Sequence, residues 1–233
     1  MSKSRGNVVA PDDLVNKYGA DTVRSYLMFF ARWDMGAPWS YSGIEGTVRW
    51  LRRVWALVLE STHPKPTASD ETLKVLRRKT HQTLKHITHD FEQFEFNTIV
   101  SSLMELLNDL YKAREQGAAG SSEWDEALDI YLRMLAPVCP HIAEELWSCQ
   151  GKSYSIHTQP WPAVDEAATK EEMITLVLQV NGKVRDRLDV PVGISEADAK
   201  TAALASEVVQ KFLEGRPPKK VIVVPGRLVN VVG

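Results

Sequence analysis

Apolar residues recur every three or four positions through the middle of the chain, which is the pattern of helices that bury one face. The first such stripe consists of Ile44, Val48, Leu51, Trp55 and Val58. Further stripes cover about 70–91, 97–116, 123–136 and 140–149. Helices of this length are only marginally stable alone in water, so the stripes are expected to pack together. The pattern predicts a helical bundle within residues 44–163, in which Asp70 is the N-cap of the second helix.

Two shorter helices are expected in the first 43 residues. Pro11, with the acidic Asp12 and Asp13 behind it, is typical of a helix start, and Gly19 is typical of a helix end. A second helix is predicted over about Asp21–Arg32. These helices form a segment that precedes the bundle.

Beyond Pro160-Trp161-Pro162, apolar and polar residues alternate, which predicts strands. Residues 174–180 and 184–190 are expected to form a hairpin at Asn181-Gly182. A two-residue loop would put the two apolar sets on opposite faces of the hairpin. A three-residue loop with Gly182 in a left-handed bulge instead places Leu178 opposite Val184, and we predict that loop.

A capping box that begins at Ser195 predicts a helix running to about Leu213, with a break near Ser206. A second hairpin follows, with a type II turn at Pro225-Gly226. The predicted fold class is therefore α+β and multidomain. It is mainly an α-helical bundle, followed by a small ββαββ C-terminal domain over residues 164–233.

With 44% hydrophobic and 25% charged residues, the chain has the composition of a globular protein, which argues against disorder. No apolar run approaches the ~20 residues that span a bilayer, so no membrane partner is expected. Cys139 and Cys149 form neither a disulfide framework nor a zinc site, which favours a reducing cytoplasm. The net charge of −2 does not by itself indicate a nucleic-acid partner, although basic residues cluster at 49–53 and 211–227.

The N-terminal residues resemble a catalytic loop. Met1-Ser2-Lys3-Ser4-Arg5-Gly6-Asn7 is similar to the Lys-Met-Ser-Lys-Ser (KMSKS) loop of class I aminoacyl-tRNA synthetases, whose lysines stabilise charge on the phosphates of ATP. The runs Val8–Asp13 and Lys17–Arg24 are similar to those that follow this loop in the leucine, isoleucine, valine and methionine enzymes. A match of this length indicates membership rather than chance.

Other segments narrow the resemblance. Phe96–Glu105 and Leu135–Trp147 are similar to the helical anticodon-binding-type domain of the whole subgroup. Val180–Arg185 and Lys219–Asn230 resemble the small C-terminal domain of bacterial leucyl-tRNA synthetases, whereas the other members end differently. The resemblance covers essentially the whole chain and favours the leucine-specific family.

This resemblance implies three domains: the KMSKS loop and its supporting helices over 1–43, a tRNA-binding bundle over 44–163 and a C-terminal tRNA-binding domain over 164–233. In this family ATP and leucine form leucyl-adenylate, and the leucyl group then passes to tRNA-Leu. Lys3 is expected to stabilise the phosphates of ATP, with Mg²⁺ in the full enzyme, while Ser2 and Ser4 shape the loop. The resemblance implies tRNA contacts at Arg49, Arg52, Arg53, Lys183, Arg185, Arg187, Lys219, Lys220 and Arg227.

Several features of the family pattern are absent from the sequence. The first lysine of the loop is missing, Arg5 stands where lysine is common, and Asp186 stands where glycine is frequent. A His-Ile-Gly-His-type motif and the editing domain are also missing. We therefore expect a C-terminal fragment, truncated within the loop, that is catalytically incomplete and binds no ATP tightly. Leucine and ATP would need the N-terminal half, and the full enzyme would be a cytoplasmic monomer.

Two alternative functions stay open on these observations. An equivalent piece of the isoleucine, valine or methionine enzyme would share the loop and the bundle but not the tail. A free-standing tRNA-binding module that has lost catalysis would share all three.

Two residue groups have structural interpretations that we prefer to functional ones. His141, Glu144 and Glu145 are interpreted as a helix start with solvent-facing acidic side chains, not as metal ligands. Most of the helical tryptophans are expected in the core rather than on RNA-stacking surfaces. These tryptophans are Trp50, Trp55, Trp124 and Trp147.

Overall fold

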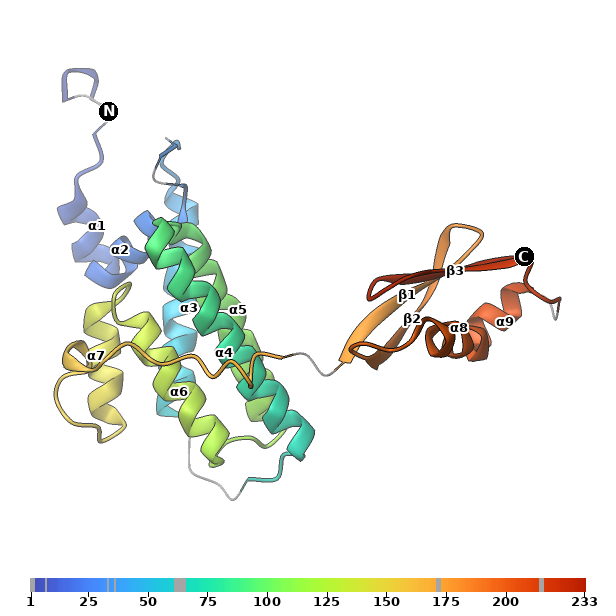
Figure 1. The fold of residues 1–233 in the computed structure, drawn as a ribbon. Coiled ribbons are helices and arrows are strands. Elements are labelled where there is room, and N and C mark those ends of the chain that lie inside the picture. The colour runs from blue at the N-terminus through green and yellow to red at the C-terminus, as the bar shows by residue number, and fades with distance from the viewer. Residues whose placement is uncertain are drawn as a thin grey trace. The chain divides into compact units, whose positions relative to one another are not determined.

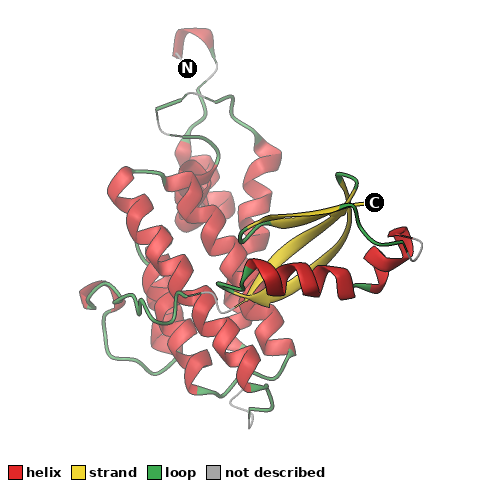
Figure 2. Cartoon of the chain, turned by 45° about the vertical axis from the view of Figure 1, so that its right-hand side comes forward, coloured by secondary structure: helices red, strands yellow, loops and turns green. Residues whose placement is uncertain are grey.

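A computed structural model describes residues 3–6, 8–32, 34–35, 37–60, 66–170, 173–213 and 216–233. The side chains of Lys3, Tyr41 and Met173 lie outside that description. The chain divides into two compact units, Met1–Thr169 and Lys170–Gly233 (Figure 1). Figure 2 shows that the first unit is helical and that the strands belong to the second.

The helices of the first unit follow the apolar stripes of the sequence. They are α1 (Pro11–Tyr18), α2 (Ala20–Phe29), α3 (Tyr41–Leu59), α4 (Asp70–Gln93), α5 (Phe96–Glu115), α6 (Ser122–Leu135) and α7 (Pro140–Cys149). Short 3₁₀ turns occur at Lys3–Arg5 and Ile156–Thr158. The predicted helical bundle is confirmed, and α2 ends three residues earlier than expected, since Phe29 rather than Arg32 is its last residue.

Serine side chains begin several of these helices. The hydroxyl of Ser69 accepts a hydrogen bond from the Thr72 N–H at 3.2 Å, so the N-cap of α4 is Ser69 and the prediction of Asp70 was wrong by one residue. Asp70 instead lies in the first turn, where its charge favours the positive end of the helix dipole. Ser121 caps α6 in the same way, through the Trp124 N–H.

The large core lies between α3, α4, α5, α6 and α7. Its fully buried members include Leu57, Leu84, Ile87, Leu103, Leu107, Tyr131 and Leu132. Trp50, Trp124 and Trp147 are buried as predicted, but Trp55 is 37% exposed, so its place in the apolar stripe of α3 was wrong. The buried face of α3 runs through Trp50 and Val54 instead, because other helices pack on that side.

A second, smaller core joins α1 and α2 to the start of α3. It is built from Leu14, Val23, Tyr26 and Ile44. The Tyr26 hydroxyl donates to the carbonyl of Ser40 at 2.8 Å, and its ring meets Trp39 edge-on at 5.1 Å. An added Cβ at Gly43 would lie 2.9 Å from the Tyr26 ring, so this close approach requires glycine.

The second unit is a four-stranded sheet with two helices against one face. Its elements are β1 (Met173–Val180), β2 (Lys183–Pro191), α8 (Glu196–Ala205), α9 (Glu207–Leu213), β3 (Lys220–Val224) and β4 (Leu228–Val232). The strand order is β2-β1-β4-β3, with β1 parallel to β4 and the other pairs antiparallel. The predicted break in the helix is confirmed at Ser206, whose hydroxyl caps α9 through the Val209 N–H.

The hairpin between β1 and β2 differs from the prediction. Val180 pairs with Lys183 across a two-residue turn, in which Asn181 and Gly182 have φ values of 50° and 76°. The prediction of a three-residue loop was therefore wrong. The apolar sets are brought to one face by a bulge further along, because the register shifts at Leu178 and Gln179 and leaves Arg185 as the extra residue.

A charged network holds the segment after the bundle onto α4 and α6. Arg77 donates to Glu126 at 2.8 Å and to Asp165 at 2.9 Å. The buried His81 accepts from the Asp165 N–H at Nδ1, so its Nε2 carries the proton that faces Glu126 at 3.2 Å. This network fixes the path of the chain at Asp165.

Arg77 also controls the acidity of both carboxylates. Burial raises the pKa of Glu126, but the hydrogen bonds from Arg77 and His81 outweigh it and hold that pKa below its ordinary value of 4.5. The hydrogen bond from Arg77 holds the pKa of Asp165 below its ordinary value of 3.8. Both groups therefore stabilise the fold near neutral pH, and that stabilisation disappears as pH falls through the lowered pKa values.

We predict that Arg77→Met lowers the free energy of unfolding of the first unit by about 1 kcal/mol at pH 7, because the three partners are partly exposed. Urea unfolding followed by tryptophan fluorescence measures this unit alone, since all 7 tryptophans lie at or before Trp161. The difference from the unsubstituted chain should shrink below pH 4. The exposed ion pair of Lys85 and Glu166 provides the control. If Glu166→Gln lowered the free energy of unfolding as much as Arg77→Met does, the stabilising role assigned to the Arg77 network would be contradicted.

Candidate functional site

The N-terminal loop begins the first candidate site. Lys3–Arg5 forms a 3₁₀ turn, and the side chains of Ser4 and Arg5 are exposed. Ser2 and the side chain of Lys3 lie outside the described residues. The expected roles of these residues toward ATP therefore remain predictions.

A hollow of about 570 Å³, which we call the basin, lies where α1, α2, α3 and α7 meet. It is lined by Lys17, Tyr18, Thr22, Glu45, Val48, Arg49, Leu51, Arg52, Trp55 and Ile142. Three of these residues are cationic and one is anionic. The basin therefore carries positive charge in a chain whose net charge is −2.

The cations of the basin come from two elements that are distant in sequence. Arg49 and Arg52 lie three residues apart on α3 and so project from the same side of that helix. Neither guanidinium has a hydrogen-bond or ion-pair partner among the residues that the structure describes. Lys17 comes from α1, with its Nζ 4.8 Å from the centre of the Tyr18 ring, and Tyr18 raises the pKa of that ammonium group. Lys17 is therefore charged at neutral pH.

Arg53 has a different environment from its neighbours in the basic cluster. Its Nη2 donates to the Asn108 side chain at 2.9 Å, and its guanidinium lies 4.8 Å from the centre of the Tyr111 ring. The Tyr111 hydroxyl in turn donates to the carbonyl of Arg53. The structure thus ties Arg53 to α5 and leaves Arg49 and Arg52 at the basin.

The alternation of side chains along a regular strand would put Lys183, Arg185 and Arg187 on one face of β2, but the structure does not place them together. Lys183 pairs with Val180 and so lies on the side that the helices cover, whereas Arg187 pairs with Val177 on the open side. Arg185, the extra residue of the bulge, places its guanidinium 4.0 Å from the Phe212 ring of α9. The bulge causes this separation, because it interrupts the alternation of the strand.

The remaining basic residues of the second unit lie around the second hairpin. Lys219 donates to the carbonyl of Gly233 at 3.3 Å. Lys220 begins β3, opposite Val232, and Arg227 closes the turn by donating its N–H to the carbonyl of Val224. Together with Gly226 at a φ of 68°, that bond matches the predicted type II turn.

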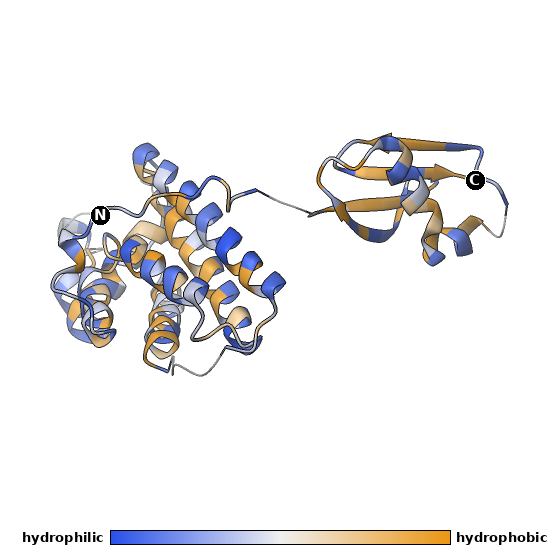
Figure 3. Cartoon of the chain, turned by 60° about the horizontal axis from the view of Figure 1, so that its bottom comes forward, coloured by the Kyte–Doolittle hydropathy of each residue, from blue (hydrophilic) through white to orange (hydrophobic). Residues whose placement is uncertain are grey.

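The open face of the sheet carries exposed apolar side chains, which the sequence analysis missed. Val184 is 55% exposed, and Ile222 and Val224 are also exposed. Figure 3 shows hydrophobic residues along much of the length of the strands. The signal in the sequence was the continuous apolar run of β3, which leaves alternate residues on the uncovered face.

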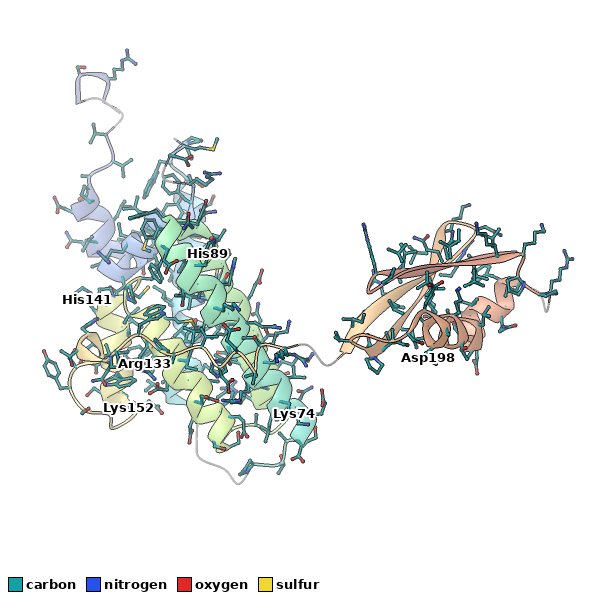
Figure 4. All side chains as sticks on the ribbon, viewed as in Figure 1. Lys74, His89, Arg133, His141, Lys152 and Asp198 are labelled. Carbon is teal, nitrogen blue, oxygen red and sulfur yellow. The ribbon has the colours of Figure 1, made fainter. Side chains whose placement is uncertain are left out.

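A buried carboxylate joins α2 to the start of α7. Asp21 is only 5% exposed and accepts hydrogen bonds from His141 Nδ1 at 2.8 Å and from the Ile142 N–H at 2.7 Å. His141, labelled in Figure 4, lies in the first turn of α7, where the helix dipole favours an anion. Since Ile142 lines the basin, this joint sets the position of α1 and α2 against α3.

Glu144 differs from its expected role as a solvent-facing residue. It accepts hydrogen bonds from the hydroxyl of Ser155 and from the Ile156 N–H, and so ties α7 to the following 3₁₀ turn. Within the described ranges, no three histidine, cysteine or acidic side chains are grouped as metal ligands. Nor does any helix in that part of the chain have the length and hydropathy to cross a membrane.

Comparisons with protein families place the chain among tRNA ligases. Residues 74–201 match the anticodon-binding domain of tRNA ligase, and residues 1–35 match the class I tRNA synthetases for isoleucine, leucine, methionine and valine. The chain is 54% identical to a leucine–tRNA ligase of Dehalococcoides mccartyi (strain BAV1) and 50% identical to that of Deinococcus radiodurans. Each alignment covers 100% of this chain and 28% of the relative, so the chain spans less than a third of their length.

Solved structures give the same grouping. A leucyl-tRNA synthetase from Agrobacterium radiobacter K84, in ternary complex with tRNA and LeuAMS, matches with a TM-score of 0.78 and 31% identity. The match covers 100% of this chain and 30% of that one. A methionyl-tRNA synthetase of Mycobacterium tuberculosis shares the fold alone, at a TM-score of 0.54 and 18% identity over 66% of this chain.

We predict that Asp21→Ala destabilises the first unit by about 2 kcal/mol, because it removes a buried carboxylate and leaves the partly buried Ile142 N–H without its acceptor. His141→Ala should cost about 1 kcal/mol or less, since the His141 side chain is 76% exposed and the Ile142 bond remains. Urea unfolding followed by tryptophan fluorescence measures the free energy of unfolding of both variants. Equal losses in the two variants would show that the buried carboxylate is not the main joint between α2 and α7.

Proposed function

The chain belongs to the tRNA ligases that carry an anticodon-binding domain, and it corresponds to the C-terminal part of their leucine-specific members. From this membership we propose that the chain is the RNA-holding portion of a leucine–tRNA ligase. The alternative of an isoleucine, valine or methionine enzyme is disfavoured, because the relatives at 50–54% identity are leucine-specific over the whole chain. The proposed partner is tRNA-Leu.

The observation that carries the proposal is the set of unpartnered cations on both units. Arg49 and Arg52 on α3, and Arg187 on the open side of the sheet, project charge that the described residues do not neutralise. Such groups gain most from phosphate oxygens, because phosphate binding releases the counterions of the RNA. Contacts of this kind position an RNA without reading its bases.

The sheet adds apolar surface to this charge. Val184 on β2 and Ile222 and Val224 on β3 are exposed at the two edges of the open face. Arg187 and Lys220 lie on the same face. Apolar side chains of this kind contact ribose and base surfaces, while the cations contact phosphates. We propose that the second unit contacts tRNA through this face, with Arg227 at its edge.

The N-terminal loop would contribute to the chemistry of the complete enzyme. There the carboxylate of leucine attacks the α-phosphorus of ATP, pyrophosphate leaves, and the terminal ribose of tRNA-Leu then takes the leucyl group from the adenylate. We propose that Lys3 stabilises the phosphate charge that develops in the first step, with Mg²⁺ supplied with ATP, and that Ser2 and Ser4 shape the loop. ATP and leucine would bind chiefly to the part of the enzyme that this chain does not span.

We predict that the chain binds tRNA-Leu more tightly than tRNA-Val, and that both affinities weaken as salt rises, because phosphate contacts supply most of the binding. Fluorescence anisotropy with labelled transcripts, at salt concentrations from about 50 to about 300 mM, measures the two affinities. Equal and weak binding of both transcripts would contradict autonomous recognition of tRNA-Leu. Absence of binding would contradict the RNA-holding function itself.

A further inference from the structure

The basin combines features that fit one kind of ligand. Arg49 and Arg52 form a row on α3, and one turn further along the same side Trp55 presents an exposed ring. Lys17 reaches the basin from α1. Three cations beside a flat apolar wall suit a chain of alternating anionic and sugar groups better than an isolated anion.

We propose that the basin binds the ribose–phosphate backbone of RNA, with Lys17, Arg49 and Arg52 contacting phosphates and Trp55 packing against a ribose. This inference rests on the proposed RNA-holding function and assigns one site within it. It unites residues from the loop-supporting helices and from the bundle, which the sequence analysis put in different domains.

Glu45 is the feature of the basin that a simple phosphate site does not explain. Glu45 lies one turn before Arg49 on α3 and, among the described residues, forms an ion pair with neither Arg49 nor Lys17, although its charge contributes to the raised pKa of Lys17. A carboxylate repels phosphate but accepts a hydrogen bond from a ribose 2′-hydroxyl, which DNA lacks. Glu45 thereby makes the basin selective for RNA over DNA.

The cation assignment is tested with the double variant Arg49→Gln/Arg52→Gln in the full chain. For tRNA-Leu, the slope of log affinity against log salt should become shallower by roughly 2, about one for each lost phosphate contact, and the affinity should weaken several-fold. Lys17→Gln should reduce the slope by about 1. The control, Lys74→Gln/Lys79→Gln, removes the same charge from exposed positions of α4 (Lys74 is labelled in Figure 4) and should leave the slope unchanged.

The outcomes separate this inference from the proposed function. If the unsubstituted chain binds tRNA-Leu and the basin variants keep its slope and affinity, the basin assignment fails and the RNA-holding function stands. If the unsubstituted chain binds no tRNA, both fail. Urea unfolding by tryptophan fluorescence, which covers the unit that holds the basin, verifies that each variant is folded.

The role of Glu45 is tested with a DNA strand of the same sequence as the tRNA. The unsubstituted chain should prefer RNA, and Glu45→Ala should reduce the RNA-to-DNA affinity ratio by roughly tenfold, since a hydrogen bond to a charged group is lost and a repulsion toward DNA is removed. Arg49→Gln/Arg52→Gln should weaken the binding of both RNA and DNA. An unchanged ratio in Glu45→Ala would overturn the assignment of the 2′-hydroxyl contact.

Discussion

The packing of α3 on two sides is the constraint on which the candidate site depends. Near its start α3 is held by the small core through Ile44, and further along it is held by the large core through Trp50 and Val54. A helix held in this way has only a narrow strip left for solvent. Arg49 and Arg52 occupy that strip, so their position is set by the apolar residues beside them rather than by any contact of their own.

The buried carboxylate of Asp21 determines what faces that strip. A charge with 5% exposure is costly unless donors surround it, and here two donors from the first turn of α7 do so. The favourable geometry exists only when α2 lies against α7, so Asp21 selects one placement of the short N-terminal helices. That placement brings Lys17 of α1 to the same hollow as Arg49.

The sequence predicted most of the fold because helical periodicity and turn chemistry are local. The bundle, the break at Ser206 and the Pro225-Gly226 turn followed from neighbouring residues alone. The errors arose where distant packing decides. Trp55 fits the apolar period of α3 but lies outside the face of α3 on which the other helices pack. The bulge that leaves Arg185 unpaired depends on which side of the sheet α8 and α9 cover. Likewise, only the structure separates Arg53, bound to Asn108, from Arg49.

The difference between paired and unpaired charge explains how a chain of net charge −2 presents a basic surface. Many acidic groups are neutralised within the fold, as Glu126 and Asp165 are by Arg77, and as Asp129 is by Arg133 and Lys152. Paired charges contribute little to the field at a distance, because the two signs cancel. The field that an approaching polyanion meets comes from cations without such partners. In the first unit three such cations lie together at the basin, where they face a single carboxylate.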